Sequence, residues 1–356
     1  MRDSQTNSPV AGSTAVKELQ RENDRLTAAL AACEAMGKYR PKGSPAPFYA
    51  GRGKRRGKSE RKLSAALLLS DWHVGELVEE RGPDGALLGV HGPKAATRKV
   101  EQLGDAALAV GDRHTAGAYA LDHLTVALLG DFMTGYIHPE CVETVAVPPV
   151  EEAYLATQLV GDLLERIAAH TPARTVRVVC RHGNHSRTTP ENRLSTGAGH
   201  SWETFMYYML RRALDRVRTR AGNPLEWVID TGLQTYTVEP VIGRVRWIHG
   251  HEIRFGSGIL GPLIPIARHV QRWDALPGCQ AALTAMGHFH QLTVVDGPPG
   301  LAVNGSLIGG TRYSLSLGHF AAPAQAHLVY SAHHGCRFAV DELRPAAVPR
   351  GCTGAG

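Results

Sequence analysis

Five short motifs of aspartate, asparagine and histidine follow five separate apolar runs in this sequence. In chain order they are Asp71-Trp72-His73, Gly130-Asp131, Gly183-Asn184-His185, His249-Gly250-His251 and Gly287-His288-Phe289-His290. Their carboxylate and amide oxygens and imidazole nitrogens are ligands for divalent metal ions, and a histidine that binds no metal can donate a proton near neutral pH. The motifs therefore indicate metal-assisted chemistry with acid catalysis.

The apolar runs before the motifs are expected to be strands that end at one edge of a sheet. They comprise residues 65–70, 124–129, 175–180, 245–248 and 281–286. The run 175–180 is rich in valine, which favours a buried strand, and open α/β sheets place their active sites at the carboxyl ends of strands. Gly183 would let the backbone turn tightly enough to present Asn184 and His185 to one point.

Helices between these runs complete the expected core. Helices predicted at residues 94–110 and 150–170 make the first three strands a βαβαβ unit with its ligand loops side by side. A further helix is predicted at 202–218, followed by strands at 226–230, 234–239 and 244–248. Later strands at 292–296, 301–304 and 326–331 predict a second, partly antiparallel sheet.

The ordered series of motifs resembles the calcineurin-like metallophosphoesterase superfamily, over roughly residues 63–341. The resemblance implies an α/β fold, a four-layer α/β/β/α sandwich that holds two divalent cations between the strand ends. It assigns the first cation to Asp71, His73, Asp131 and His290. It assigns the second to Asp131, Asn184, His249 and His288. The family pattern makes His249 the ligand and places His251 on the substrate side, although the inverse assignment of these two histidines stays open.

The resemblance also implies a mechanism. Oxygen and imidazole ligands without thiolate suit Mn²⁺ first, with Fe²⁺, Zn²⁺ or Mg²⁺ as alternatives. A hydroxide that bridges the two cations would attack the phosphorus atom of a phosphodiester. His185, which is not a ligand in the family pattern, would protonate the leaving alkoxide as the catalytic acid.

Two departures from the family pattern narrow the expected activity. Family phosphatases that act on phosphoproteins carry an arginine and a second aspartate shortly after Gly-Asp, whereas Phe132-Met133-Thr134-Gly135 follows here. An acidic residue commonly follows Gly-Asn-His, but Ser186 stands there, so another group must orient His185 or none does. Arg187 is expected to bind a phosphate oxygen of the substrate, because guanidinium forms paired hydrogen bonds with phosphate, with an ordinary surface arginine as the alternative.

The basic character of the chain belongs to its first 62 residues. They carry 14 Lys or Arg and 6 Asp or Glu, a net charge of +8, while the remaining 294 residues carry 25 and 27, a net of −2. The densest run, residues 52–62, has no apolar face to bury. It is either a solvated linker or a segment that neutralises nucleic-acid phosphates.

The sequence predicts three parts. Residues 1–62 form an N-terminal extension, with a short heptad helix at 14–36 and a basic Pro/Gly-rich linker at 37–62. Residues 63–343 form the phosphoesterase domain, and residues 344–356 a disordered tail. Within the helix, residues 16–33 carry a heptad seam with Asn23 at one a position, which predicts a homodimer, with an unpaired helix as the alternative.

Cysteine usage and hydropathy indicate the compartment. Six cysteines are scattered without a Cys-x-x-Cys pair, which predicts reduced thiols and a cytoplasmic protein. No apolar run approaches the roughly 18 residues that a membrane span needs, and the amino terminus lacks the apolar core of a signal peptide. We therefore expect no membrane partner.

These features favour a phosphodiesterase or nuclease that acts on DNA. Ile137-His138-Pro139-Glu140, Arg187 after the Gly-Asn-His motif, and Asn304-Gly305-Ser306 also resemble the bacteriophage and prophage branch of the superfamily, which implies a role in phage or bacterial DNA metabolism. One alternative is a small-molecule or cyclic-nucleotide phosphodiesterase or a phosphomonoesterase, for which the basic segment is only a linker. The other is a non-catalytic scaffold that binds nucleic acid.

Overall fold

The computed structural model describes residues 61–343, apart from 83–84, 86, 116–118, 255–260, 296–298, 317–320 and 332–336. The predicted heptad helix at 14–36 and the predicted tail at 344–356 lie outside the described residues. The predicted basic linker at 37–62 also lies outside them, except for its last two residues, which begin the first strand. None of the helices in the described ranges is both long and apolar enough to cross a bilayer.

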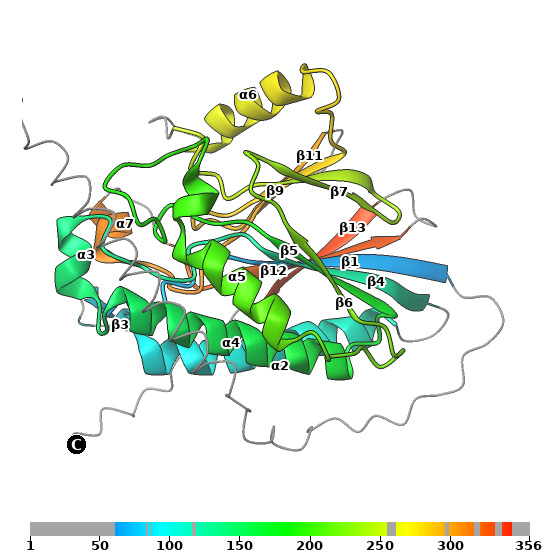
Figure 1. The fold of residues 1–356 in the computed structure, drawn as a ribbon, viewed down its shortest axis with the longest axis horizontal. Coiled ribbons are helices and arrows are strands. Elements are labelled where there is room, and N and C mark those ends of the chain that lie inside the picture. The colour runs from blue at the N-terminus through cyan, green and yellow to red at the C-terminus, as the bar shows by residue number, and fades with distance from the viewer. Residues whose placement is uncertain are drawn as a thin grey trace, which may run out of the picture. The chain divides into compact units, whose positions relative to one another are not determined.

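Six strands form the first sheet, in the order β13-β12-β1-β4-β5-β6 (Figure 1). Their bounds are β1 Arg61–Leu69, β4 Tyr119–Leu128, β5 Thr175–Cys180, β6 Leu225–Ile229, β12 Gln325–Ser331 and β13 Arg337–Leu343. Strands β1, β4, β5 and β6 run parallel. They are connected by α2 (Pro93–His114), α4 (Pro149–His170) and α5 (Trp202–Ala213), which confirms the predicted βαβαβ core.

Five strands form the second sheet, in the order β10-β11-β9-β8-β7. Their bounds are β7 Thr235–Glu239, β8 Gly243–Trp247, β9 Leu283–Met286, β10 Thr293–Val295 and β11 Gly300–Val303. The prediction that the strand at 326–331 belongs to this sheet is wrong, because β12 pairs antiparallel with β1 and β13 in the first sheet. All seven residues of β12 are buried, as expected for a strand with neighbours on both edges and layers on both faces.

The remaining elements lie in the connections, and the sequence analysis did not predict them. They are the hairpin of β2 (Val78–Arg81) and β3 (Leu87–His91), the short helices α3 (Pro139–Thr144) and α7 (Arg312–Ser316), the 3₁₀ turn Gly197–His200, and α6 (Leu263–Asp274). The short elements lack the length of apolar pattern that identifies a helix or strand in a sequence.

Alternation along β1 shows why the domain has layers. Leu67 and Leu69 face α2, α4 and α5, whereas Ala66 and Leu68 face the second sheet, because successive strand residues point to opposite faces. Ile266 and Val270 of α6 pack on the outer face of the second sheet. The result is the expected four-layer α/β/β/α sandwich (Figure 1).

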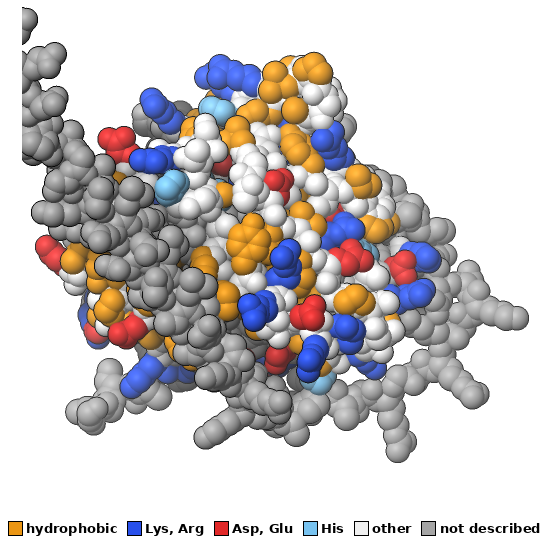
Figure 2. Space-filling view, viewed as in Figure 1, with side chains coloured by type: hydrophobic (Ala, Val, Ile, Leu, Met, Phe, Trp, Pro, Cys, Tyr) orange, Lys and Arg blue, Asp and Glu red, His pale blue; other side chains and the backbone are white. Residues whose placement is uncertain are grey.

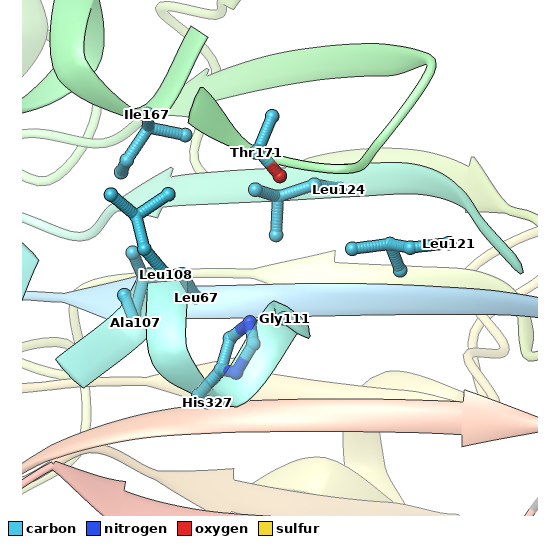
Figure 3. Close-up of a pocket in the computed structure, with 9 residues that line it drawn as sticks. All are labelled: Leu67, Ala107, Leu108, Gly111, Leu121, Leu124, Ile167, Thr171 and His327. Carbon is cyan, nitrogen blue, oxygen red and sulfur yellow. The ribbon is translucent and has the colours of Figure 1, made fainter. Parts of the chain in front are cut away.

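A small cavity lies between the helices and the first sheet (Figure 3). Its lining is mainly apolar and comprises Leu67, Ala107, Leu108, Gly111, Leu121, Leu124, Ile167, Thr171 and His327. None of the predicted ligands lines it. The cavity is therefore a packing feature of the helix–sheet layer, separate from the predicted site.

A buried carboxylate joins the two sheets. Glu239 of β7 accepts hydrogen bonds from Thr125 of β4 and from Thr237, and lies 3.0 Å from ring nitrogen Nε2 of His123. Arg177 of β5 also donates to it at 3.0 Å. Burial alone would raise the pKa of Glu239, but the bonds from His123, Thr125 and Thr237 outweigh burial and lower the pKa to about 2.

We expect Glu239→Gln to lower the free energy of unfolding by about 2–4 kcal/mol near neutral pH, because the buried donors lose their anionic partner. The folded pKa lies below the ordinary value of 4.5, so this stabilisation is complete above pH 4.5 and is lost as the pH falls towards 2. Denaturant unfolding across this pH range should show the wild type and the variant converging in acid.

Glu226→Gln is the matched control, because Glu226 bonds the same Arg177 at 3.2 Å but its side chain is 46% exposed. Exposed ion pairs contribute about 1 kcal/mol or less. Equal losses of unfolding free energy in the two variants would contradict a special role for Glu239.

Candidate metal centre

The loops after the strands are tied to one another by backbone hydrogen bonds. The loop after β1 bonds the loop after β4, with the Asp71 amide donating to the Gly130 carbonyl at 2.9 Å and the Trp72 amide to the Asp131 carbonyl at 2.8 Å. The loops after β8 and β9 are joined in the same way, by the Gly287 amide and the His249 carbonyl at 2.9 Å. The His288 amide donates to Oδ2 of Asp71 at 3.0 Å, so the motifs of both sheets meet at one end of the sandwich.

The structure brings all seven predicted ligands together. Three groups of side chains have ligand atoms within 4.8 Å of one another: Asp71, His73 and His290; Asp131, His249 and His288; and His73, Asp131 and His185. Asn184 joins the second group, with Oδ1 3.2 Å from Nε2 of His249. With Asn184, the second group is the second set that the resemblance implies, whereas the first group is the first set without Asp131. Their donor atoms suit a divalent metal ion, whose identity the geometry does not specify.

The backbone at the ligands is strained. Asp71, His73, Asp131, His288 and His290 have φ between 45° and 71°, in the left-handed region that residues other than glycine rarely adopt. Only one other non-glycine residue in the described part of the chain has a positive φ. Strain of this kind costs about 1–3 kcal/mol per residue and collects at functional sites.

The glycines of the motifs provide room for the ligands. A Cβ atom on Gly183 would overlap the Asp131 carboxylate, and one on Gly130 would overlap the backbone of Gly183. A Cβ atom on Gly287 would lie 2.5 Å from Oδ2 of Asp71 and from Oγ of Ser70. The carboxylates can reach the centre because these three positions carry no side chain.

Ring nitrogen Nε2 of His249 lies next to two ligand oxygens, so a proton or a cation must supply positive charge there. Its Nδ1 lies 2.6 Å from the Leu129 carbonyl and must carry a hydrogen, so in a neutral ring Nε2 presents a lone pair. That lone pair would point at Oδ2 of Asp131, 3.0 Å away, and at Oδ1 of Asn184. A proton on the ring or a divalent cation resolves the repulsion, and this geometry favours His249 over His251 as the ligand.

The ionisation of the centre also fits a cation. Burial opposes positive charge on the His249 ring, but the attraction of the Asp131 carboxylate is stronger and raises the pKa of His249 to about 10. Burial likewise opposes ionisation of Asp131, yet His249 and His185 hold the pKa of that carboxyl well below its ordinary range. The carboxylate is therefore anionic, and the proton on His249 occupies the place where a metal would supply the charge.

His73 and His288 are in the form that binds metals. Burial lowers the pKa of His73 well below its ordinary value and that of His288 to about 3, so both rings are neutral. Both ring nitrogens of His73 are buried without a hydrogen-bond partner. Buried polar atoms are normally paired, so the orphaned nitrogens of His73 fit a metal ligand.

His185 is oriented by a backbone carbonyl. Its Nδ1 lies 2.9 Å from the oxygen of Thr134, and its backbone amide donates to Oδ1 of Asp131 at 2.9 Å. The carbonyl fixes the Nδ1–H tautomer and leaves Nε2 as the remaining functional atom. The Thr134 carbonyl thus takes the orienting role that an acidic residue at position 186 would have. Because every residue has a backbone carbonyl, residue types give no sign of this role.

The two predicted substrate contacts lie beside the centre. Arg187 donates to the carbonyls of Asn184 at 3.1 Å and of Ile137 and Pro190 at 3.4 Å, so its guanidinium ties the loops together in this structure. The ring of His251 lies 5.4 Å from that of His249, and its Nδ1 is buried without a partner. Contact of either residue with substrate stays a prediction.

The sequence analysis missed two buried carboxylates that hold the ligand loops. Glu152 of α4 accepts from the amides of Gly75, Thr134 and Gly135. Glu203 of α5 accepts from the amides of Phe132 at 2.6 Å and Gly183 at 2.7 Å and from the Ser186 hydroxyl at 3.0 Å. Both lie in the first helical turn, where acidic residues are common, so only their burial distinguishes them.

A third anchor, also missed, lies behind Asp71. Oε1 of the Gln325 side chain accepts from the Ser70 amide at 3.0 Å and from the Trp72 indole at 3.3 Å. Asn304 donates to the Ser70 hydroxyl at 2.9 Å and accepts from the Ala326 amide at 2.9 Å. In the sequence Asn304 stands out only as part of the stretch Asn304-Gly305-Ser306 that resembles the phage branch.

Comparisons with known proteins give a weak likeness. No family model matches the chain, and no curated protein matches it. Among solved structures, Vps29 from Entamoeba histolytica has a TM-score of 0.29 at 12% identity, covering 78% of this chain and 98% of its own. The 5'-nucleotidase from Candida albicans has a TM-score of 0.32 at 10% identity, and the match covers 81% of this chain and 52% of the nucleotidase. The phosphopantetheinyl hydrolase from Mycobacterium tuberculosis has a TM-score of 0.27 at 12% identity, and the match covers 68% of this chain and 90% of the hydrolase. Likeness this slight identifies no activity.

Gly287→Ala is expected to weaken Mn²⁺ binding about 10–100-fold, because the added methyl group would displace the Asp71 carboxylate. Losses of this size are typical when a group that supports a metal ligand is removed. Gly199→Ala is the matched control, since a Cβ atom there meets no atom within 4 Å. Isothermal titration with Mn²⁺ compares the two. Wild-type affinity in Gly287→Ala would contradict the placement of Asp71 at the centre.

Proposed function

We propose that the chain is a metal-dependent phosphoesterase of the calcineurin-like kind, with a centre for two divalent cations. The observation that carries this proposal is the position of Asp131, which belongs to two of the three histidine-containing groups and lies beside His185. When bound, two divalent cations would supply an activated water and stabilise charge on the phosphate oxygens. Mn²⁺ is the first candidate, because the ligands combine oxygen and imidazole without thiolate.

The chain's own residues would hold the reacting groups and move one proton. The His185 amide fixes Oδ1 of Asp131, so that Oδ2 faces His249. The carbonyl of Thr134 holds Nδ1 of His185, so Nε2 is available to carry a proton to the leaving oxygen. Such acid catalysis contributes about 10²–10⁴-fold to the rate.

A phosphodiester of DNA is the proposed substrate, in phage or bacterial DNA metabolism. Basic charge supports it, because residues 52–62 concentrate Lys and Arg while residues 63–356 carry a net −2. On the visible face of the described part, basic and acidic side chains are interspersed (Figure 2). The proposal therefore places phosphate attraction in residues 52–62. Dimerisation through residues 16–33 and a cytoplasmic location are part of the same proposal.

Hydrolysis of a chromogenic phosphodiester and of the matching monoester with Mn²⁺ tests the reaction class. We expect a preference for the diester, and Asp131→Ala should abolish both activities because it removes the shared carboxylate. A preference for the monoester would indicate a phosphomonoesterase. Retention of metal without hydrolysis of either compound would indicate a non-catalytic scaffold and contradict the proposal.

Deletion of residues 1–60, which leaves β1 whole, tests the substrate. We expect weaker binding of DNA and a shallower dependence of binding on salt, because fewer counterions are released from the phosphates. Turnover of the small chromogenic diester should be unchanged, which controls for folding. Unchanged DNA affinity would contradict the DNA proposal and favour a small-molecule or cyclic-nucleotide diester.

A further inference from the structure

Glu152 is a buried carboxylate that belongs to no ligand group. It lies in the first turn of α4, and its side chain is closed off from solvent. Oε1 accepts from the Gly75 amide at 3.0 Å and from the Thr134 amide, and Oε2 accepts from the Gly135 amide at 3.0 Å. One side chain therefore binds the loop that follows His73 and the loop that follows Asp131.

The peptide unit that Glu152 holds leads directly to His185. The Gly135 amide donates to Oε2 of Glu152 at 3.0 Å, and the Thr134 carbonyl in the same planar peptide unit binds Nδ1 of His185 at 2.9 Å. Gly75 makes the approach of Glu152 feasible, since a Cβ atom there would lie 2.7 Å from the carboxyl carbon. Gly135 packs as closely on the other side, where a Cβ atom would overlap the backbone oxygen of His185.

We propose that Glu152 is the positioning residue for His185, acting through the peptide unit between Thr134 and Gly135 in place of an acidic residue after the Gly-Asn-His motif. The inference rests on the proposed function, in which His185 protonates the leaving oxygen. Glu152 touches neither substrate nor the proposed ligands. It sets the direction of the Thr134 carbonyl and, through that carbonyl, the tautomer and plane of the imidazole.

The number of amide donors around Glu152 explains why this position needs a carboxylate. Three amides converge on one carboxylate, and a glutamine at this position would turn an N–H group toward at least one of these donors. A buried amide without an acceptor costs about 1–3 kcal/mol, so residues 134–135 would shift to find a new partner. His185 would then lose the acceptor for Nδ1–H, and part of the population would carry the proton on Nε2.

The kinetic test compares two diesters that differ in leaving group. Thymidine 5'-(4-nitrophenyl) phosphate releases a stable phenolate that needs no proton, whereas a thymidine dinucleotide releases an alkoxide that does. Glu152→Gln should lower kcat on the dinucleotide about 10–100-fold and on the nitrophenyl ester less than about 3-fold, the pattern of a lost acid catalyst. His185→Ala should show the same selectivity, and the double variant should lose little more.

Two further variants separate positioning from general damage. Glu151→Gln is the matched control, because Glu151 occupies the same helical turn but is exposed. It should match the wild type on both esters. Glu152→Asp keeps a carboxylate on a shorter arm and should recover part of the rate on the dinucleotide.

A second readout does not depend on activity. Nitrogen-15 NMR of the imidazoles, with His185 assigned from its absence in His185→Ala, reports which ring nitrogen carries the proton. The Nδ1–H form should dominate in the wild type and in Glu151→Gln, and a mixture should appear in Glu152→Gln. An unchanged tautomer together with equal rate losses on both esters would overturn the inference. If the wild type hydrolyses neither ester, the proposed function fails while the tautomer still decides the positioning role.

Discussion

The close approach of the loop after β4 to the loop after β5 is the constraint on which the centre depends. Gly130 and Gly183 lie against each other with no room for a side chain, and this brings the His185 amide to Asp131 at 2.9 Å. The carbonyl of Asp131 in turn receives the amides of the loop after β1. Asp131 is thus fixed at its backbone and at one carboxylate oxygen, and the histidines of the second sheet are arranged around the other oxygen.

The acidic residues around this centre are of two physical kinds. Asp71 and Asp131 face imidazole nitrogens at 3.3 and 3.0 Å, so their charge is balanced by groups that a cation can replace. Glu152 and Glu203 are balanced by backbone amides instead, and burial raises the pKa of Glu203 to about 7. Because their acceptor positions are already used, they stabilise the loops without competing for a metal.

The sequence predicted what depends on local pattern. The valine-rich run at 175–180 is β5 with the same bounds, and the residues that follow the strands do converge. Sheet membership of β12 was not predictable, because its partner β1 lies far away in the sequence and pairing leaves no mark on residue type. The carbonyl that orients His185 belongs to Thr134 only by backbone position. Glu152 and Glu203 read as ordinary first-turn helix acids, and the left-handed backbone at Asp71 and His290 has no signature outside glycine.

The position of β1 has a consequence for the order in which the protein is made. β1 lies inside the first sheet between β4 and β12, and Leu63 pairs with Ser331, so one edge of an early strand is completed by one of the last. Gln325, which holds Ser70 and Trp72, comes from the same late segment. During synthesis the first ligand loop emerges long before its supports and before His288 and His290. Until β12 is available the nascent chain exposes an apolar strand edge open to wrong pairing, and the proposed metal ligands come together only in the finished chain.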